Sequence, residues 1–184
     1  QLRTSVSYGP LGEGGPPALV FADRLGRVHT VNPQTGERVW AVGGRHSELA
    51  AITGAPVLFR DRIIVPVSSS GVGRGADPNY ECCAEHGAVV ALDAATGRKL
   101  WTYHTMREAG YTGRVNLLGV RLRGPSGAPI WSTPTVDAAR GLVYATTGQN
   151  TSLPATATSD AVLAIDLATG ELVWSFQALA NDVW

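Results

Sequence analysis

The sequence of 184 residues has no long apolar run, no separated cysteines and no excess of charge, and each absence excludes a class of protein. Basic and acidic residues both number 15, so nothing predicts an electrostatic partner such as nucleic acid or an anionic membrane. No stretch approaches the roughly 20 apolar residues of a membrane-spanning helix. The composition therefore predicts a chain with no nucleic-acid partner and no membrane span.

The cysteine content excludes several kinds of site. Cys82 and Cys83 are adjacent, so no separated pair links distant segments and the spaced ligands of a zinc site are missing. No Cys-x-x-Cys-His sequence is present, so the chain has no motif for covalent attachment of a haem. Cys82 and Cys83 are either two free thiols or a disulfide between neighbours, and both alternatives remain open.

A tryptophan closes the same ten-residue phrase three times. Each copy contains an Asp or Asn, two further residues, Thr-Gly, two mostly polar residues, a Val or Leu, and Trp. The copies run from Val31 to Trp40, from Leu92 to Trp101 and from Ile165 to Trp174. An apolar run precedes each copy, the Asx side chain can cap a turn, and Gly tolerates a positive φ. The phrase therefore predicts a repeated hairpin.

Two further strand-like runs precede each hairpin, beginning in the first repeat with residues 4–7. Four antiparallel strands in tandem repeats, with 22 glycines and 11 prolines for turns, predict an all-β propeller. We expect residues 1–184 to form part of a propeller, with blades at 1–43, 54–105 and 130–178. Propellers have about four to eight blades, so three predict a segment of a longer ring. Two arcs paired head to tail in a six-bladed ring are the alternative.

Three insertions lengthen the repeats, at residues 69–87, 105–130 and 148–159. In an antiparallel blade all three fall on the face opposite the short Thr-Gly turns. Long loops on a rigid scaffold commonly carry function, although they are also simply tolerated. We therefore predict the functional site on the face with the insertions.

Several stretches resemble one family of enzymes. They are Val65–Ser69, Tyr80–Cys83 followed by Gly87, Ile130–Asp137 and Thr147–Asn150, together with the tryptophan phrase. The phrase resembles the tryptophan-docking repeat of eight-bladed propellers that bind pyrroloquinoline quinone (PQQ), and the other stretches are similar to polyvinyl-alcohol dehydrogenase-like quinoproteins. The resemblance covers essentially the whole chain. It implies the quinoprotein alcohol dehydrogenase-like fold, with three four-stranded antiparallel blades of an expected eight.

The resemblance also implies an activity. It implies a dehydrogenase that oxidises an alcohol by hydride transfer to a calcium-bound quinone, in the periplasm or outside the cell. Its partners would be the alcohol, a cytochrome c electron acceptor and the remaining propeller blades. The alternative is a non-enzymatic propeller that binds proteins or assists outer-membrane assembly, because such scaffolds carry the docking repeat too.

Three residues are implied as PQQ contacts. In such enzymes a tryptophan lies flat under the quinone, and Trp131 stands where that pattern puts it. A disulfide between Cys82 and Cys83 would lie against the other face of the quinone. The alternatives are that Trp131 belongs to the core and that the cysteines are two small hydrophobic residues.

Calcium binds about six to eight oxygen ligands, and the candidates here are Gln149, Asn150 and Glu81. For Asn150 the alternatives are turn chemistry or a glycosylation sequon with Thr151 and Ser152. His86 stands where close relatives carry an arginine, and as a lone loop histidine we expect it at the surface. The family's general base, an aspartate, lies in a later blade, so no residue of this chain is assigned as catalytic.

Overall fold

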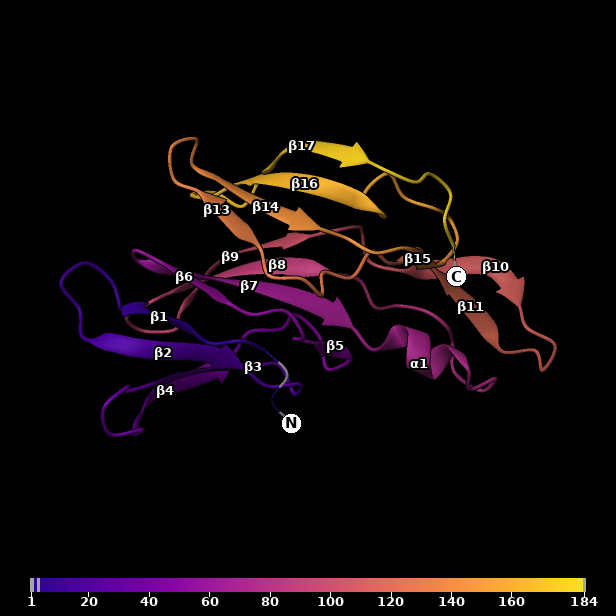
Figure 1. Cartoon of the computed structure of the whole chain (residues 1–184). Coiled ribbons are helices and arrows are strands. Elements are labelled where there is room, and N and C mark those ends of the chain that lie inside the picture. The colour runs from indigo at the N-terminus through magenta and orange to yellow at the C-terminus, as the bar shows by residue number, and fades with distance from the viewer. Residues whose placement is uncertain (1, 3, 184) are drawn as a thin grey trace.

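The computed structural model describes residue 2 and residues 4–183, and it is built from antiparallel sheets that stack face on face (Figure 1). The first sheet contains β1 (Ser7–Pro10), β2 (Pro17–Ala22), β3 (Arg27–Val31) and β4 (Arg38–Gly43). The second contains β6 (Val57–Phe59), β7 (Arg62–Ser69), β8 (Ala88–Asp93) and β9 (Lys99–His104), and β5 (Ala50–Ala51) pairs with the end of β7. The third contains β13 (Thr135–Asp137), β14 (Leu142–Thr146), β16 (Ala161–Asp166) and β17 (Leu172–Gln177). The predicted all-β fold of four-stranded antiparallel units is confirmed.

The repeated phrase forms the same hairpin in each sheet. In the second sheet, the amide of Gly97 donates to the carbonyl of Asp93 at 2.8 Å, and the Asp93 carboxylate accepts from the amide of Thr96 at 2.8 Å. Gly97 has a φ of +74°, a conformation that costs an L-residue with a side chain about 1–2 kcal/mol. The turn therefore depends on the aspartate and the glycine that the sequence repeats.

Each tryptophan of the first two copies docks on the turn of the next sheet. The indole of Trp40 packs on Gly97, where an added Cβ would come within 3.1 Å of the ring, and its Nε1 donates to the Ala94 carbonyl at 3.3 Å. The indole of Trp101 packs on Gly170, and its Nε1 donates to the Leu167 carbonyl at 3.2 Å. The docking contact thus joins consecutive sheets.

Two apolar layers fill the spaces between the sheets. The first layer, with Val28, Val65 and Val90 at its centre, lies between the first and second sheets. The second, with Val89 and Leu163, lies between the second and third. Alternate residues of β8 enter opposite layers, which explains why the whole of this central strand is apolar up to its last residue.

The first strand differs from the prediction of residues 4–7. The observed strand, β1, runs from Ser7 to Pro10, with Ser7 opposite Val20 of β2. Thr4 instead binds the end of β2 through its side chain, which accepts from the Ala22 amide at 3.1 Å and donates to the Ala22 carbonyl at 3.2 Å. The predicted strand therefore began too early and ended too early. Thr4 contacts β2 through its side chain, whereas β1 begins at Ser7 and extends to Pro10, a residue that an edge strand tolerates.

The insertions contain short elements of their own. They are α1 (Gly71–Gly75), β10 (Gly110–Val115), β11 (Arg121–Gly124), β12 (Ser126–Gly127) and β15 (Asn150–Ser152). β10 and β11 form a hairpin, and β12 pairs with β15. Among the described residues, no helix is long and apolar enough to cross a membrane.

The docking contact makes a testable prediction about two turn glycines. Gly170 (φ +78°) faces the Trp101 ring, where a Cβ would come within 2.6 Å, whereas Gly119 (φ +78°), in the turn between β10 and β11, has nothing within 4 Å. We expect Gly119→Ala to lower the free energy of unfolding by about 1–2 kcal/mol through backbone strain. Gly170→Ala should cost a further 1–3 kcal/mol or so, because the methyl group displaces the indole. Urea denaturation of the two variants of the full-length protein measures the difference, and equal losses would contradict the docking role.

Candidate functional site

The insertions gather at one end of the stacked sheets. In Figure 1, α1, the β10–β11 hairpin and β15 lie together beyond this end of the strands. Pairing links them: the amide of Gly127 donates to the Glu85 carbonyl at 2.9 Å, and the amide of Ala128 donates to the Gln149 carbonyl at 2.8 Å. These contacts give loops from three parts of the chain a fixed common arrangement.

A disulfide joins Cys82 to Cys83. The pair is held against β11, because the Cys83 amide donates to the Arg123 carbonyl at 3.1 Å and the Arg123 amide donates to the Cys82 carbonyl at 2.8 Å. Cys83 is buried and Cys82 is half-buried. The end of α1 packs on the sulfurs, since a Cβ on Gly75 would lie 3.3 Å from Cys82 Sγ. Of the two alternatives left open by the sequence, the structure contains the disulfide.

Glu81 is held by two arginines. Its carboxylate accepts from Arg123 Nε at 2.8 Å and from Arg121 Nη2 at 3.0 Å. These hydrogen bonds, that from Arg123 first, lower the pKa of Glu81 below its usual value. The side chain is thus an anion whose lone pairs are already shared with two cations, and a calcium ion would have to replace these contacts.

Trp131 lies on the same face with 48% of its surface exposed. Its ring packs against Gly148, where an added Cβ would come within 2.6 Å of Cζ2 and Cη2. The amide of Gly148 donates to the Pro129 carbonyl at 3.0 Å, which fixes the glycine beside the ring. Glycine is required at this position because any side chain would displace the indole.

The segment after Gly148 connects Trp131 to the disulfide. Thr151 and Ser152 line an open pocket of about 260 Å³ together with Cys82 and Arg123. One end of residues 148–152 therefore touches the exposed indole, and the other end borders the disulfide.

Two predicted calcium ligands lie in this segment, and they differ in burial and in hydrogen bonding. Asn150 is fully buried, and its Oδ1 accepts from the Thr156 hydroxyl at 3.1 Å and from the Thr156 amide at 3.3 Å. These contacts fit the turn-chemistry alternative for Asn150. Gln149 is half-buried, and within the described part of the chain its side chain makes no hydrogen bond. Gln149 is consequently the amide with an oxygen to offer.

A family model for the PQQ β-propeller, described as "Glucose/ethanol/alcohol dehydrogenase, beta-propeller domain", matches residues 41–184. The chain belongs to this family. The predicted resemblance to the propellers of quinoproteins is thereby confirmed.

Curated relatives within the family are alcohol dehydrogenases. The chain is 38% identical over 182 residues to a polyvinylalcohol dehydrogenase from Sphingopyxis sp. (strain 113P3), and 35% identical to one from Pseudomonas sp.. Both matches cover 98% of this chain but 28% of the relative. The chain therefore spans little more than a quarter of the length of these relatives.

Solved structures support the same fold. The quinohemoprotein alcohol dehydrogenase ADHIIG from Pseudomonas putida HK5 superposes with a TM-score of 0.68 at 20% identity, over 91% of this chain and 26% of that one. A europium-containing methanol dehydrogenase gives a TM-score of 0.67 at 20% identity, over 98% of this chain and 33% of that one.

The expectation for His86 was wrong. This histidine is 2% exposed, and its Nε2 lies 2.8 Å from Nδ1 of His104. Its ring also stacks on that of His46, with centroids 4.7 Å apart. No pattern in the sequence indicates the cluster, because the three histidines come from three separate segments.

The quinoprotein's disulfide makes a testable prediction about its thiols. When the full-length protein is denatured without reductant and alkylated, the peptide containing Cys82 and Cys83 should be unmodified and two hydrogens lighter than its dithiol form. After reduction, both cysteines should be alkylated, because the bond between them has been broken. Mass spectrometry of the peptide measures both states. Alkylation of both residues before reduction would contradict the disulfide.

Proposed function

We propose that this chain forms part of a PQQ-dependent alcohol dehydrogenase whose substrate is an alcohol of the polyvinyl-alcohol type. The observation that carries the proposal is the segment 148–152, which packs on the half-exposed indole of Trp131 and borders the Cys82–Cys83 disulfide. The 38% identity with a polyvinylalcohol dehydrogenase supports the substrate class.

The residues present fit a flat aromatic cofactor. An indole with 48% of its surface exposed offers a rigid apolar face for stacking. Gly148 leaves room behind this ring, and the disulfide gives a second apolar surface in the same group of loops. We propose that Trp131 contacts one face of PQQ and that the disulfide lies against the other, with the half-buried Cys82 outermost and the buried Cys83 behind it.

The proposed calcium ligands are side chains that offer an oxygen atom. We propose that Gln149 supplies an amide oxygen to calcium, since its side chain has no hydrogen bond to give up among the described residues. Asn150 and Glu81 remain proposed ligands. To bind the ion, Asn150 would have to give up its hydrogen bonds with Thr156, and Glu81 those with the two arginines. Calcium favours oxygen donors of these kinds.

The chain's own part in the reaction is binding and orientation. PQQ, when bound, accepts the hydride that leaves the alcohol carbon. Trp131 would hold the plane of the cofactor, and the disulfide and the segment 148–152 would exclude water from one side of it. No residue of this chain is proposed as the general base.

The proposed partners fit the exposed surfaces. On the outer side of the third sheet, Val173, Trp174 and Phe176 are exposed, with 43% of Trp174 accessible. Because Trp40 and Trp101 each dock on the next sheet, we propose that Trp174 docks on a further blade of the full-length protein.

A cytochrome c is the proposed electron acceptor. The disulfide supports an oxidising location, the periplasm or outside the cell.

The first test is binding of the cofactor. The full-length protein is titrated with PQQ at several calcium concentrations, and cofactor absorbance and tryptophan quenching are followed. We expect saturable, calcium-dependent binding, because stacking and ion coordination both need the assembled face. An absence of binding at any calcium concentration would refute the proposal and favour the scaffold alternative.

The second test is Trp131→Ala. Removing the stacking surface should weaken PQQ binding about tenfold, since an aromatic pair contributes about 0.5–1.5 kcal/mol beyond the area that it buries. PQQ-dependent dye reduction at limiting cofactor should fall in parallel. Tyr8→Ala is the control, because Tyr8 is exposed on β1 of the first sheet and should bind PQQ as the wild type does. Unchanged binding by Trp131→Ala would remove Trp131 from the site.

A further inference from the structure

Three of the four histidines of the chain converge at the end of the sheets that carries the insertions. His46 follows β4 of the first sheet, His86 precedes β8 of the second, and His104 is the last residue of β9. One ring nitrogen of each lies within 4.8 Å of the others. Chain segments separated in sequence thus bring three imidazoles to one point.

The rings contact one another closely. His86 Nε2 lies 2.8 Å from His104 Nδ1, and the ring of His46 stacks on His86 while meeting His104 edge-on, at centroid distances of 4.7 and 5.0 Å. Donor nitrogens about 2.0–2.1 Å from a tetrahedral ion lie roughly 3.3 Å apart. Small side-chain rotations would therefore convert this packing into a ligand set.

Two buried nitrogens in the cluster are without a hydrogen-bond partner. His46 Nδ1 and His86 Nδ1 are inaccessible to solvent and make no hydrogen bond with the described residues. Such a group costs about 1–3 kcal/mol, and a structure usually retains it for a reason. Coordination of an ion is one interaction that would satisfy it.

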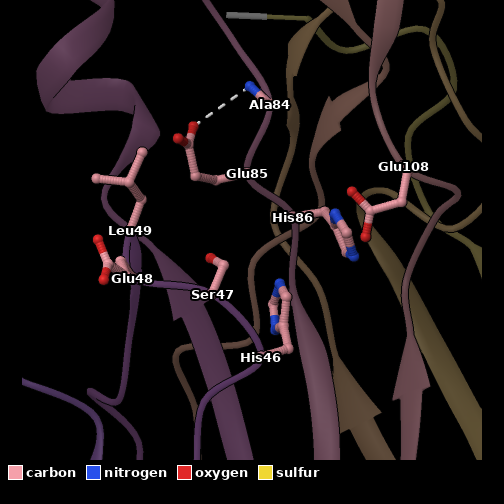
Figure 2. Close-up of a pocket in the computed structure, with 8 residues that line it drawn as sticks. All are labelled: His46, Ser47, Glu48, Leu49, Ala84, Glu85, His86 and Glu108. Atoms are coloured by element: carbon pink, nitrogen blue, oxygen red, sulfur yellow. Dashed lines mark hydrogen bonds between the residues drawn. The ribbon is translucent and has the colours of Figure 1, made fainter.

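Burial disfavours the protonated form of two of the rings. Burial, with the neighbouring His86 and His104, lowers the pKa of His46 to about 4, so His46 is neutral at pH 7. Burial also lowers the pKa of His86. Neutral imidazole is the form that binds metals. Glu108, whose carboxylate lies beside the His86 ring in Figure 2, adds a negative charge that favours a cation.

The cluster is open to solvent on one side. A pocket of about 450 Å³ is lined by His46, His86 and Glu108, together with Ser47 and Glu48 (Figure 2). His104 is itself exposed. An ion therefore has a path of entry, and a water molecule has room to complete its coordination.

We propose that His46, His86 and His104 form a binding site for a divalent transition metal, zinc being the ion that this set suits best. Three imidazoles with an open fourth position match zinc coordination, whereas calcium prefers oxygen ligands. The bound ion would link His46, which follows the last strand of the first sheet, to His86 and His104 of the second sheet. His86 lies in the same insertion as Cys82 and Cys83, but the three zinc ligands are distinct from the residues proposed to contact PQQ or calcium.

Zinc uptake by the full-length protein tests the proposal. After treatment with a chelator, the protein is dialysed against zinc in the absence of PQQ and with calcium in large excess, and bound metal is measured by mass spectrometry. We expect one zinc per chain in this site, undisturbed by calcium because calcium does not compete for imidazole. Cobalt as a second probe should give the visible absorption of a tetrahedral nitrogen site.

Variants assign the ion to the cluster. His104→Gln should lower zinc affinity by more than the roughly 10-fold that loss of an outer partner costs, and His46→Gln and His86→Gln should do the same. His29→Gln is the matched control, because the fourth histidine pairs with Asp23 at 2.9 Å on the first sheet and should leave zinc uptake unchanged. His104 is exposed, so its variant tests the proposal even where His86→Gln fails to fold.

Two results would overturn the proposal. One is an absence of zinc uptake by the wild type, which would leave the cluster as a hydrogen-bonded stack. The other is unchanged uptake by His104→Gln. Neither result bears on PQQ binding, since the measurement contains no cofactor, and a failure to bind PQQ would likewise leave the zinc result intact.

Discussion

The contact between an indole and the turn glycine of the next sheet is the interaction on which the rest of this structure depends. Trp40 and Trp101 fill the space that Gly97 and Gly170 leave by having no side chain, and each indole nitrogen bonds a carbonyl of the same turn. The contact fixes both the distance and the rotation between sheets. The two apolar layers then close between them, and the opposite ends of the strands are free to carry long loops.

The sequence predicts this scaffold well because its determinants are local. A turn made by Asp93, Thr96 and Gly97 needs only residues within one phrase, and alternation or continuous apolarity marks the strands beside it. Prediction failed where pairing competes with polar contacts, as at Thr4, and it missed the β10–β11 hairpin. That hairpin is built largely from exposed polar residues and glycine, and its pairing contains a register shift. Its sequence therefore lacks the alternation of apolar and polar residues from which a strand is predicted.

The candidate site was predictable in part. Adjacency of Cys82 and Cys83 allowed a single intramolecular bridge, and the resemblance of the stretch Ile130–Asp137 to quinoproteins indicated Trp131. The partners of these residues were not predictable. That Glu81 is shared by two arginines of β11, and that Asn150 is enclosed by Thr156, depends on how separate loops pack. His86 is the sharpest case, since its neighbours come from two other segments.

The two proposed metal sites differ in the atoms that they offer, and this difference determines how they coexist on one face. Gln149, Asn150 and Glu81 present oxygen, whereas the histidine cluster presents imidazole nitrogen. Hard cations prefer the first set and borderline transition metals the second. Each site therefore discriminates by ligand chemistry, even though the same rigid sheets carry both. A scaffold that places loops from successive sheets side by side can carry two such sets on one face, although Glu81 and His86 belong to the same insertion, because the two sets differ in the atoms that they present.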